Sequence, residues 1–273
     1  MQPTYKTKFQ GEDISFYHTY SEKNDSSRFL PHYHEKCEII YFLSGDVTYS
    51  VEGRTYKLKR GDIVISRPRQ LHLILPAEKT TYERYVAIIN HKKIPDSIWQ
   101  KLRIGKDVFT YSGNERILEL FSKLDYYYGK FDDAEYERLA FNAVEEAMFN
   151  LTLSSGEEIR ADINPIIAKA LEYIQTNLPT ISGIEEICSE LYITKSHLHH
   201  LFNEYLQITP AKYIATKRLM LAQRKIRKGG KPTEIFTECG FSDYATFFRN
   251  FKRHFGYSPT YEGKIKIEDE ILT

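Results

Sequence analysis

The sequence predicts an α+β protein, with a β-rich N-terminal region followed by a helical C-terminal region. Short runs rich in Tyr, Ile, Val and Thr alternate with Gly-containing turns through the first hundred residues, as is typical of a sandwich or small barrel. From about residue 114 the apolar residues recur at helical spacing instead. With 273 residues, the chain is long enough for two domains that each have their own core.

The β-rich region is divided into short segments by turn residues. The expected strands are Cys37–Leu43, Val47–Val51, Arg54–Leu58, Asp62–Ile65, Leu71–Leu75 and Tyr82–Ile89. Two helices are expected next, over about 114–129 and 132–153, and each has an apolar stripe that needs to be buried. A polar stretch at 156–162 is the expected linker, and Asn164-Pro165 is a typical helix start.

Composition argues against several classes of protein. Hydrophobic residues make up 41% of the chain and charged residues 27%, and no apolar stretch reaches the roughly 18–20 residues of a membrane span. The N-terminus lacks the apolar segment of a secretory signal. Cys37, Cys188 and Cys239 lie far apart with no CxxC pair, which argues against a disulfide framework or a structural zinc site. We therefore expect a cytoplasmic protein with no membrane partner.

Charge is unevenly distributed, although the formal net charge is only +1. Residues 1–160 carry 23 basic and 24 acidic side chains, whereas residues 195–253 carry 12 basic and 4 acidic ones. A basic segment after a neutral one suggests that the C-terminal part meets a polyanion. A solvated charged face would explain the same counts, so charge alone does not decide between the two.

The C-terminal region contains one motif twice, in copies separated by 49 residues. The copies, at about 184–206 and 232–255, each predict a short helix, a turn and a second helix. Gly240 is expected to supply a positive φ in its turn, and Thr194 and Ser242 to cap the helices that follow. A helix of about 18–19 residues, roughly 28 Å long, joins the copies. This is the arrangement of helix-turn-helix units that place one helix in the major groove of DNA.

The second copy also carries a family resemblance. The run from Cys239 to Pro259, CGFSDYATFFRNFKRHFGYSP, closely resembles the signature of AraC/XylS-type transcriptional regulators. Arg218, Leu219 and Ala222 resemble the linker-helix pattern of the same family. The resemblance covers about 163–262 and implies a sequence-specific DNA-binding transcription regulator. Family habit favours an activator, with double-stranded DNA as partner and RNA polymerase as a further candidate partner.

The resemblance also assigns residues that face DNA. The base-contacting positions are Ser196, His199, His200, Tyr244, Ala245 and Arg249. Candidate phosphate contacts, which position the protein without specifying a sequence, are Lys195, Thr246 and Lys252. Three positions depart from the family pattern: Cys188 and Phe236 replace a small Ala, and Gln207 replaces a Gly that Gly256 retains in the second copy. For Arg218, a structural ion pair is a simpler explanation than a phosphate contact.

A second resemblance lies in the β-rich region. His32, His34, Glu38 and Gly45 have the spacing HxH-x3-E-x6-G and look like the first cupin motif, whose two His and one Glu bind a metal on a β-barrel. His72 roughly fits the second motif, one residue closer to its proline than is usual. Three His and one Glu would suit a divalent transition metal. A metal-dependent cupin enzyme with an accessory helical domain is therefore the alternative interpretation.

We nevertheless expect no enzyme, no bound metal and no cofactor. Sensor domains of AraC-like regulators often keep such histidines as pocket linings without metal, and His and Tyr side chains can hydrogen-bond a small polar effector, for example a sugar. The expected pocket residues are His32, His34, Glu38, Tyr41 and His72. A constitutive regulator with an empty barrel is a third interpretation.

The complete expectation is a cupin-like effector-binding β-barrel over 1–110, a helical dimerisation segment over 111–155, a linker over 156–162 and an AraC-type DNA-binding domain over 163–273. The family resemblance implies that the helical segment forms a homodimer. Packing of its apolar stripes against the barrel is the simpler alternative.

Overall fold

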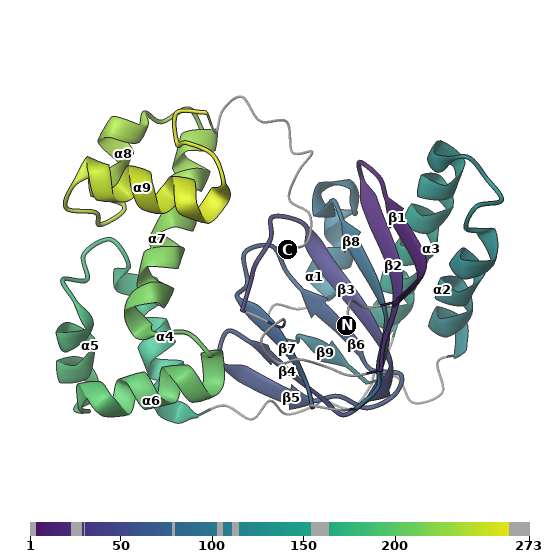
Figure 1. Ribbon diagram of the computed structural model, residues 1–273, viewed down its shortest axis with the longest axis horizontal. Helices are drawn as coiled ribbons and strands as arrows, with labels where there is room; N and C mark the ends of the chain where they lie inside the picture. Colours follow the sequence, from purple (N-terminus) through teal and green to yellow (C-terminus); the bar gives the residue numbers. More distant parts are fainter. Residues whose placement is uncertain are drawn as a thin grey trace. The chain divides into compact units, whose positions relative to one another are not determined.

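The computed structural model describes residues 4–22, 29, 31–77, 80–102, 106–110, 115–153 and 164–261. The chain divides into two compact units, Met1–Asp162 and Ile163–Thr273. The first contains the strands and the second is helical (Figure 1), which confirms the α+β class. The expected linker at 156–162 lies outside the described residues. Of the helices that are described, none is long and apolar enough to cross a membrane.

The strands of the first unit pair into two antiparallel sheets. The described strands are β1 (Thr4–Gln10), β2 (Ile14–Ser21), β3 (Cys37–Gly45), β4 (Val47–Val51), β5 (Arg54–Lys57), β6 (Ile63–Ser66), β7 (His72–Pro76), β8 (Tyr82–Ile89) and β9 (Val108–Phe109). The larger sheet has the order β1-β2-β8-β3-β6-β9 and the smaller β5-β4-β7. The six strands expected from the sequence all form, and β1 and β2 precede them in the chain. A three-residue 3-10 helix (His91–Lys93) follows β8 in the chain.

An inner core fills the space between the two sheets. Side chains from both sheets meet there because alternate residues of a strand point to opposite faces. On β3, for example, Ile40 and Phe42 belong to this core, together with Tyr49 of β4 and Tyr82 of β8. Tyr49 and Tyr82 are completely buried, so large aromatic rings occupy much of the interior.

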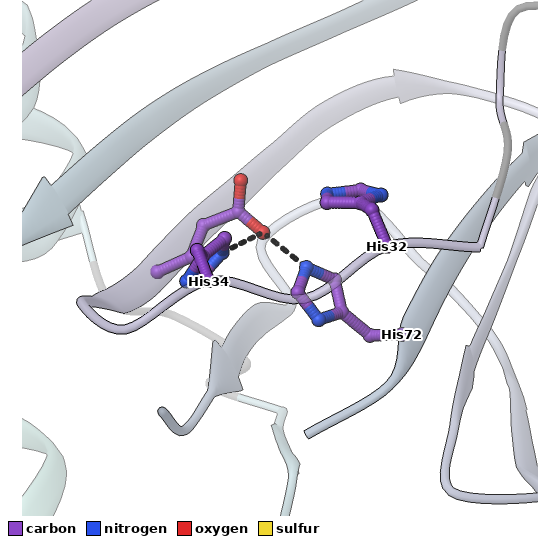
Figure 2. A group of neighbouring side chains, drawn as sticks. His32, His34 and His72 are labelled. Atoms are coloured by element: carbon purple, nitrogen blue, oxygen red, sulfur yellow. Dashed lines mark ion pairs between the residues drawn. The ribbon is translucent and has the colours of Figure 1, made fainter. Parts of the chain in front are cut away.

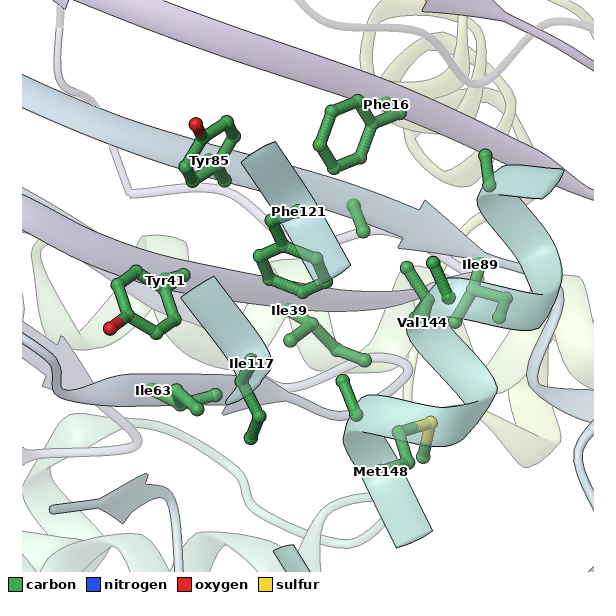
Figure 3. Close-up of a cluster of buried hydrophobic side chains, with 14 of the residues drawn as sticks. Phe16, Ile39, Tyr41, Ile63, Tyr85, Ile89, Ile117, Phe121, Val144 and Met148 are labelled. Atoms are coloured by element: carbon green, nitrogen blue, oxygen red, sulfur yellow. The ribbon is translucent and has the colours of Figure 1, made fainter. Parts of the chain in front are cut away.

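An outer core joins the larger sheet to the helices α2 (Glu115–Tyr127) and α3 (Asp133–Leu153), with the short helix α1 (Asp96–Lys101) beside them. Figure 3 shows Ile117 and Phe121 of α2 and Val144 of α3 against side chains of the sheet. The apolar stripes of both helices are thus buried within the first unit. A hydrogen bond of 2.6 Å between His18 Nδ1 on β2 and the carboxylate of Asp125 also ties α2 to the sheet.

The second unit contains the helices expected from the sequence. They are α4 (Pro165–Asn177), α5 (Ile184–Leu191), α6 (Lys195–Leu206), α7 (Pro210–Arg227), α8 (Pro232–Glu238) and α9 (Tyr244–Phe255). Asn164 caps α4 by accepting hydrogen bonds from the amides of Ile166 and Ile167. Thr209 likewise caps α7 by accepting from the amide of Lys212. Proline at the first position of α4 and α7 lacks only an amide that a helix start leaves unpaired anyway.

Candidate DNA interface and sensor site

The first helix-turn-helix unit consists of α5 and α6. Its turn contains Tyr192, which adopts a left-handed conformation with φ 55°. The hydroxyl of Thr194 then accepts a hydrogen bond of 3.1 Å from the amide of His197, so that Thr194 caps α6 as expected. Leu198 and Phe202 are completely buried and hold α6 in the core of the unit. The opposite face of α6 is therefore presented outward.

The second helix-turn-helix unit consists of α8 and α9, joined by a turn in which Gly240 has φ +83°. The expected cap Ser242 is wrong by one residue. Helix α9 begins at Tyr244, so the residue before it is Asp243, whose carboxylate accepts a hydrogen bond of 2.7 Å from the amide of Thr246. This contact and the positive end of the helix dipole hold the pKa of Asp243 below its usual value.

The connecting helix α7 is fastened to the segment that follows α4, close to Gly240 in the turn of the second helix-turn-helix unit. The Arg218 guanidinium donates hydrogen bonds to the carbonyls of Leu178 at 3.0 Å and Ile181 at 2.6 Å, just beyond the end of α4. A side chain on Gly240 would place its Cβ 2.5 Å from the Pro179 carbonyl and 2.6 Å from Arg218 Nε. Arg218 has a structural role, as expected, but it binds carbonyl oxygens and not a carboxylate.

None of the nine residues assigned to DNA contact is buried. Those on the exposed faces are Lys195, Ser196, His200, Ala245, Arg249 and Lys252, and the half-buried ones are His199, Tyr244 and Thr246. Several already have protein partners: Lys195 forms an ion pair with Glu185, and His200 Nε2 lies 3.4 Å from a carboxylate oxygen of Glu204.

An aromatic cluster supports the recognition helix of the second unit. Phe247 and Phe251 are completely buried. The ring of Phe236, at the position where the family has a small residue, lies 5.6 Å from that of Tyr244 and 6.4 Å from that of Phe247, between centroids. Part of the Tyr244 side chain is therefore packed against this cluster.

In the first compact unit, Met1–Asp162, four side chains converge at one place (Figure 2). One ligand atom from each of His32, His34, Glu38 and His72 lies within 4.8 Å of the others. His32 is held beside β7 by two backbone hydrogen bonds of 3.0 Å with His72. His72 and Glu38 are buried, with 1% and 6% of their surfaces exposed, whereas His32 is exposed.

Two of these imidazoles point Nε2 at the Glu38 carboxylate. His72 Nε2 lies 3.2 Å and His34 Nε2 3.9 Å from Glu38 Oε2. Burial raises the pKa of Glu38, but hydrogen bonding and positive charge from His34 and His72 outweigh burial and hold that pKa well below its usual value.

The expected assignment of Tyr41 to this site needs correction. Glu38 and Tyr41 are three residues apart on β3, so their side chains leave opposite faces of the sheet. The Tyr41 ring lies in the outer core, 6.0 Å from that of Phe121 on α2 (Figure 3). Its position behind the sheet separates it from the four converging side chains.

Ser66 and Tyr49 support Glu38, and of the two Ser66 was not expected from the sequence. Ser66 pairs with Glu38 across β6 and β3, and its hydroxyl donates to Glu38 Oε2 at 3.5 Å. The Tyr49 hydroxyl lies 3.0 Å from that of Ser66, and burial raises the pKa of Tyr49. Only the strand register, which the sequence did not specify, brings these residues together.

Comparison with known families divides the chain in the same way. Residues 16–124 match the AraC-like ligand binding domain, and residues 187–261 match a helix-turn-helix domain. The two matches fall in the first and the second compact unit, respectively.

Individual proteins are similar over different extents. The lactose operon transcription activator of Staphylococcus xylosus is 24% identical over 83% of this chain and 83% of that protein. The probable transcription factor PqrA of Proteus vulgaris is 30% identical over 34% of this chain and 80% of PqrA. The probable transcriptional regulator LumQ of Photobacterium leiognathi is 35% identical, but the match spans only 32% of this chain and 36% of LumQ.

Among solved structures, ToxT from Vibrio cholerae aligns over 91% of this chain and 96% of its own, with 16% identity and a TM-score of 0.39. The relatives are transcription regulators, which confirms the expected class of protein over the enzyme alternative. A ligand-binding domain followed by a DNA-binding helix-turn-helix domain places this chain in the AraC family of transcriptional regulators.

Proposed function

We propose that this regulator activates transcription of genes for sugar use when a sugar binds its first compact unit, Met1–Asp162. The observation that carries the proposal is the pair of helix-turn-helix units on one connecting helix, each with an outward face of polar and basic side chains. The similarity to a lactose operon transcription activator along 83% of the chain supports both the direction of regulation and the class of effector.

In this proposal the N-terminal halves of α6 and α9 enter the major groove. The side chains that read bases are Ser196, His199 and His200 on α6, with Tyr244, Ala245 and Arg249 on α9. Arg249 is exposed, and its planar guanidinium has the fork of donors that matches guanine O6 and N7. Lys195, Thr246 and Lys252 contact phosphates and set the position of the helices.

The length of α7 suits two units on one side of the duplex. The helix has 18 residues, which corresponds to about 27 Å at 1.5 Å per residue. One turn of DNA measures about 34 Å. We infer that the two units read successive major grooves of one operator.

The effector is proposed to bind beside His32, His34, Glu38 and His72. His32 is exposed, so the cluster can be reached from solvent, whereas the interior behind it is filled by Tyr49 and Tyr82. Imidazole nitrogens and a carboxylate offer the donors and acceptors that sugar hydroxyls require. An effector that prefers the DNA-competent state shifts the protein toward it by no more than its differential affinity.

A homodimer is the proposed assembly, formed by the outer faces of the α2–α3 segment. The stripes that pack on the sheet are used within one chain, but other large apolar side chains of this segment stay exposed. They are Tyr126, Tyr128, Phe131, Phe149 and Leu153, of which Leu153 exposes 79% of its surface. Exposed apolar groups on one segment mark a contact surface. Activation further implies contact with RNA polymerase at the promoter, on chromosomal DNA in the cytoplasm.

The test is binding of the full chain to a duplex from its own upstream promoter, compared with random duplex, at moderate salt and across a panel of sugars. We expect a preference of about 10³-fold or more for the promoter, increased by one sugar. Equal affinity for both duplexes with every sugar would contradict the proposal. If the promoter is preferred but no sugar shifts the midpoint of thermal unfolding, the constitutive interpretation is correct instead.

A dimerisation variant tests the assembly separately. Replacing Phe149 and Leu153 by Ser should yield monomers in sedimentation velocity. Operator binding should weaken, because a monomer contacts the DNA with two helix-turn-helix units and a dimer with four. The matched control replaces Lys123 and Asn142, exposed residues of the same segment, by Ser. An unchanged mass for the Phe149 and Leu153 variant would show that the dimer, if present, forms elsewhere.

A further inference from the structure

The cluster beside His32 gathers electron-rich atoms at one point. Three imidazole nitrogens and one carboxylate oxygen come from the stretch 32–34, from β3 and from β7, and they all lie within 4.8 Å of one another. The strand register holds Glu38 in place, and two backbone hydrogen bonds hold His32 against β7. The arrangement is thus built by the fold and does not depend on chance contacts of mobile surface chains.

Hydrogen bonds at the far side of two rings settle which nitrogen carries a proton. His34 Nδ1 lies 2.6 Å from the carbonyl oxygen of Lys36, and His72 Nδ1 lies 2.9 Å from that of Gln70. A carbonyl oxygen can only accept, so Nδ1 carries the hydrogen in both rings. A neutral ring therefore directs the Nε2 lone pair at the centre of the cluster.

Two of these nitrogens, His34 Nε2 and His72 Nε2, face the carboxylate of Glu38. His72 Nε2 is buried and makes no regular hydrogen bond, although it lies 3.2 Å from Glu38 Oε2. The Ser66 hydroxyl donates to the same carboxylate at 3.5 Å. A cation at the centre would satisfy the imidazoles and the carboxylate together.

We propose that His32, His34, Glu38 and His72 bind a divalent transition-metal ion through three imidazole nitrogens and one carboxylate oxygen. This donor set suits Zn²⁺, Mn²⁺, Fe²⁺, Co²⁺ or Ni²⁺ better than Ca²⁺ or Mg²⁺, which prefer oxygen ligands alone. The Nδ1 contacts to backbone carbonyls are the outer hydrogen bonds that orient metal-binding histidines. The proposal revises the expectation from the sequence that the first unit binds no metal.

The ion would be a resident part of the first compact unit and would occupy the imidazole nitrogens and the carboxylate oxygen, so that the effector would bind next to the ion and not directly to these four atoms. It would fasten the stretch 32–34 to β3 and β7, and the exposed side at His32 gives it a path for entry. Because the ion binds the folded chain and not the separated segments, loading it raises stability. The proposal does not depend on which effector the regulator senses or on its operator.

The experiment uses the full chain without an affinity tag, stripped with a chelator and dialysed against Co²⁺, Zn²⁺, Mn²⁺, Ni²⁺ or, under anaerobic conditions, Fe²⁺. We expect about one ion per chain by mass spectrometry of the metal, visible absorption bands from bound Co²⁺, and a midpoint of thermal unfolding raised by about 5–10 °C at a hundredfold excess over Kd. Glu38→Gln should lower metal affinity by more than about 10-fold, since even changes to outer hydrogen bonds cost that much.

Two further variants keep the test decisive. His32→Ala removes an exposed ligand and should weaken binding without unfolding the chain, even if Glu38→Gln folds poorly. His91→Ala, a histidine of the same unit outside the cluster, is the matched control and should retain the ion. Less than a tenth of an ion per chain with every metal would overturn the proposal. So would equal metal content in His32→Ala and the unaltered chain, because the ion would then lie elsewhere, for example on α6 beside His200 and Glu204.

Discussion

The two helix-turn-helix units have the same layout but reach it with different residues. The turn and the end of the recognition helix adopt left-handed conformations in both. In the second unit these positions are Gly240 and Gly256, whereas in the first they are Tyr192 and Gln207, with φ 55° and 51°. A side chain at positive φ costs about 1–2 kcal/mol per residue. The first unit therefore carries backbone strain that the second avoids.

The second unit is also more tightly built into its surroundings. Its turn lies under Arg218 and the carbonyl of Pro179, and its recognition helix rests on an aromatic cluster. Tyr192, by contrast, exposes 95% of its surface. Both turns require a left-handed backbone conformation, but only the turn at Gly240 also requires a residue without a side chain, because its neighbours lie so close.

The largest expected effect is at Gly240, where both the backbone conformation and the close packing require a glycine. Gly240→Ala should destabilise the second unit by about 2–5 kcal/mol, because strain at positive φ adds to overlap with Pro179 and Arg218. Urea unfolding of the full chain, followed by circular dichroism at helical wavelengths, measures it. Gly256→Ala is the control: a Cβ there meets nothing within 4 Å, so only about 1 kcal/mol is expected. Equal losses would show that packing at Gly240 is unimportant.

The next effect compares recognition residues at equivalent positions. Arg249→Ala should cost about 1–3 kcal/mol of binding at one or two operator bases, measured by titrating single-base operator variants. Arg253→Ala, which removes an exposed arginine hydrogen-bonded to Asn250 on the last turn of α9, serves as control. A uniform loss on all sequences would mean that Arg249 contacts only phosphate.

His200 is the counterpart of Arg249 in the first unit, and its replacement should matter less. Its Nε2 lies 3.4 Å from Glu204, so part of its hydrogen-bonding capacity is engaged within α6. We expect His200→Ala to cost less than about 1 kcal/mol of operator binding, below a full bidentate contact. A loss as large as that of Arg249→Ala would indicate that both units read bases equally.

The smallest expected effect comes from exchanging the residues that end the two recognition helices, Gln207 and Gly256. Gln207→Gly should stabilise the first unit by about 0.5–1 kcal/mol, because glycine adopts the left-handed conformation without a Cβ clash. The reciprocal change Gly256→Gln should destabilise the second unit by about 1 kcal/mol. Thermal unfolding of both variants checks the pair, and changes of the same sign would refute the strain argument.

Much of the fold was predictable because local signals agree with the final structure. Proline at the starts of α4 and α7, and the left-handed glycine Gly240, specify helix bounds without help from distant residues. The cap of α9 was misplaced by one residue because Ser242 and Asp243 are adjacent and both are good caps. Only the helix start, fixed by packing of Tyr244 and Phe247, selects Asp243.

The site was predictable only in part because it depends on strand register. The spacing of His32, His34 and Glu38 pointed to a common site, and His72 joins them as expected. Tyr41 was placed with them although strand alternation sends it to the helices. The support that Ser66 gives Glu38 depends on a pairing between strands 28 residues apart, which no short-range pattern reveals.

The arginine of the connecting helix has a consequence for the operator. Arg218 is bonded to the end of α4 close to Gly240, and α8 and α9 pack along Leu219, Ala222 and Ile226 of α7. We therefore expect the two helix-turn-helix units to keep a fixed spacing. If the spacing of the two units differs from the pitch of the duplex, the DNA then has to bend or twist to bind both. Operators with easily kinked pyrimidine–purine steps between the two contacted grooves should therefore be selected, even where no side chain touches those bases.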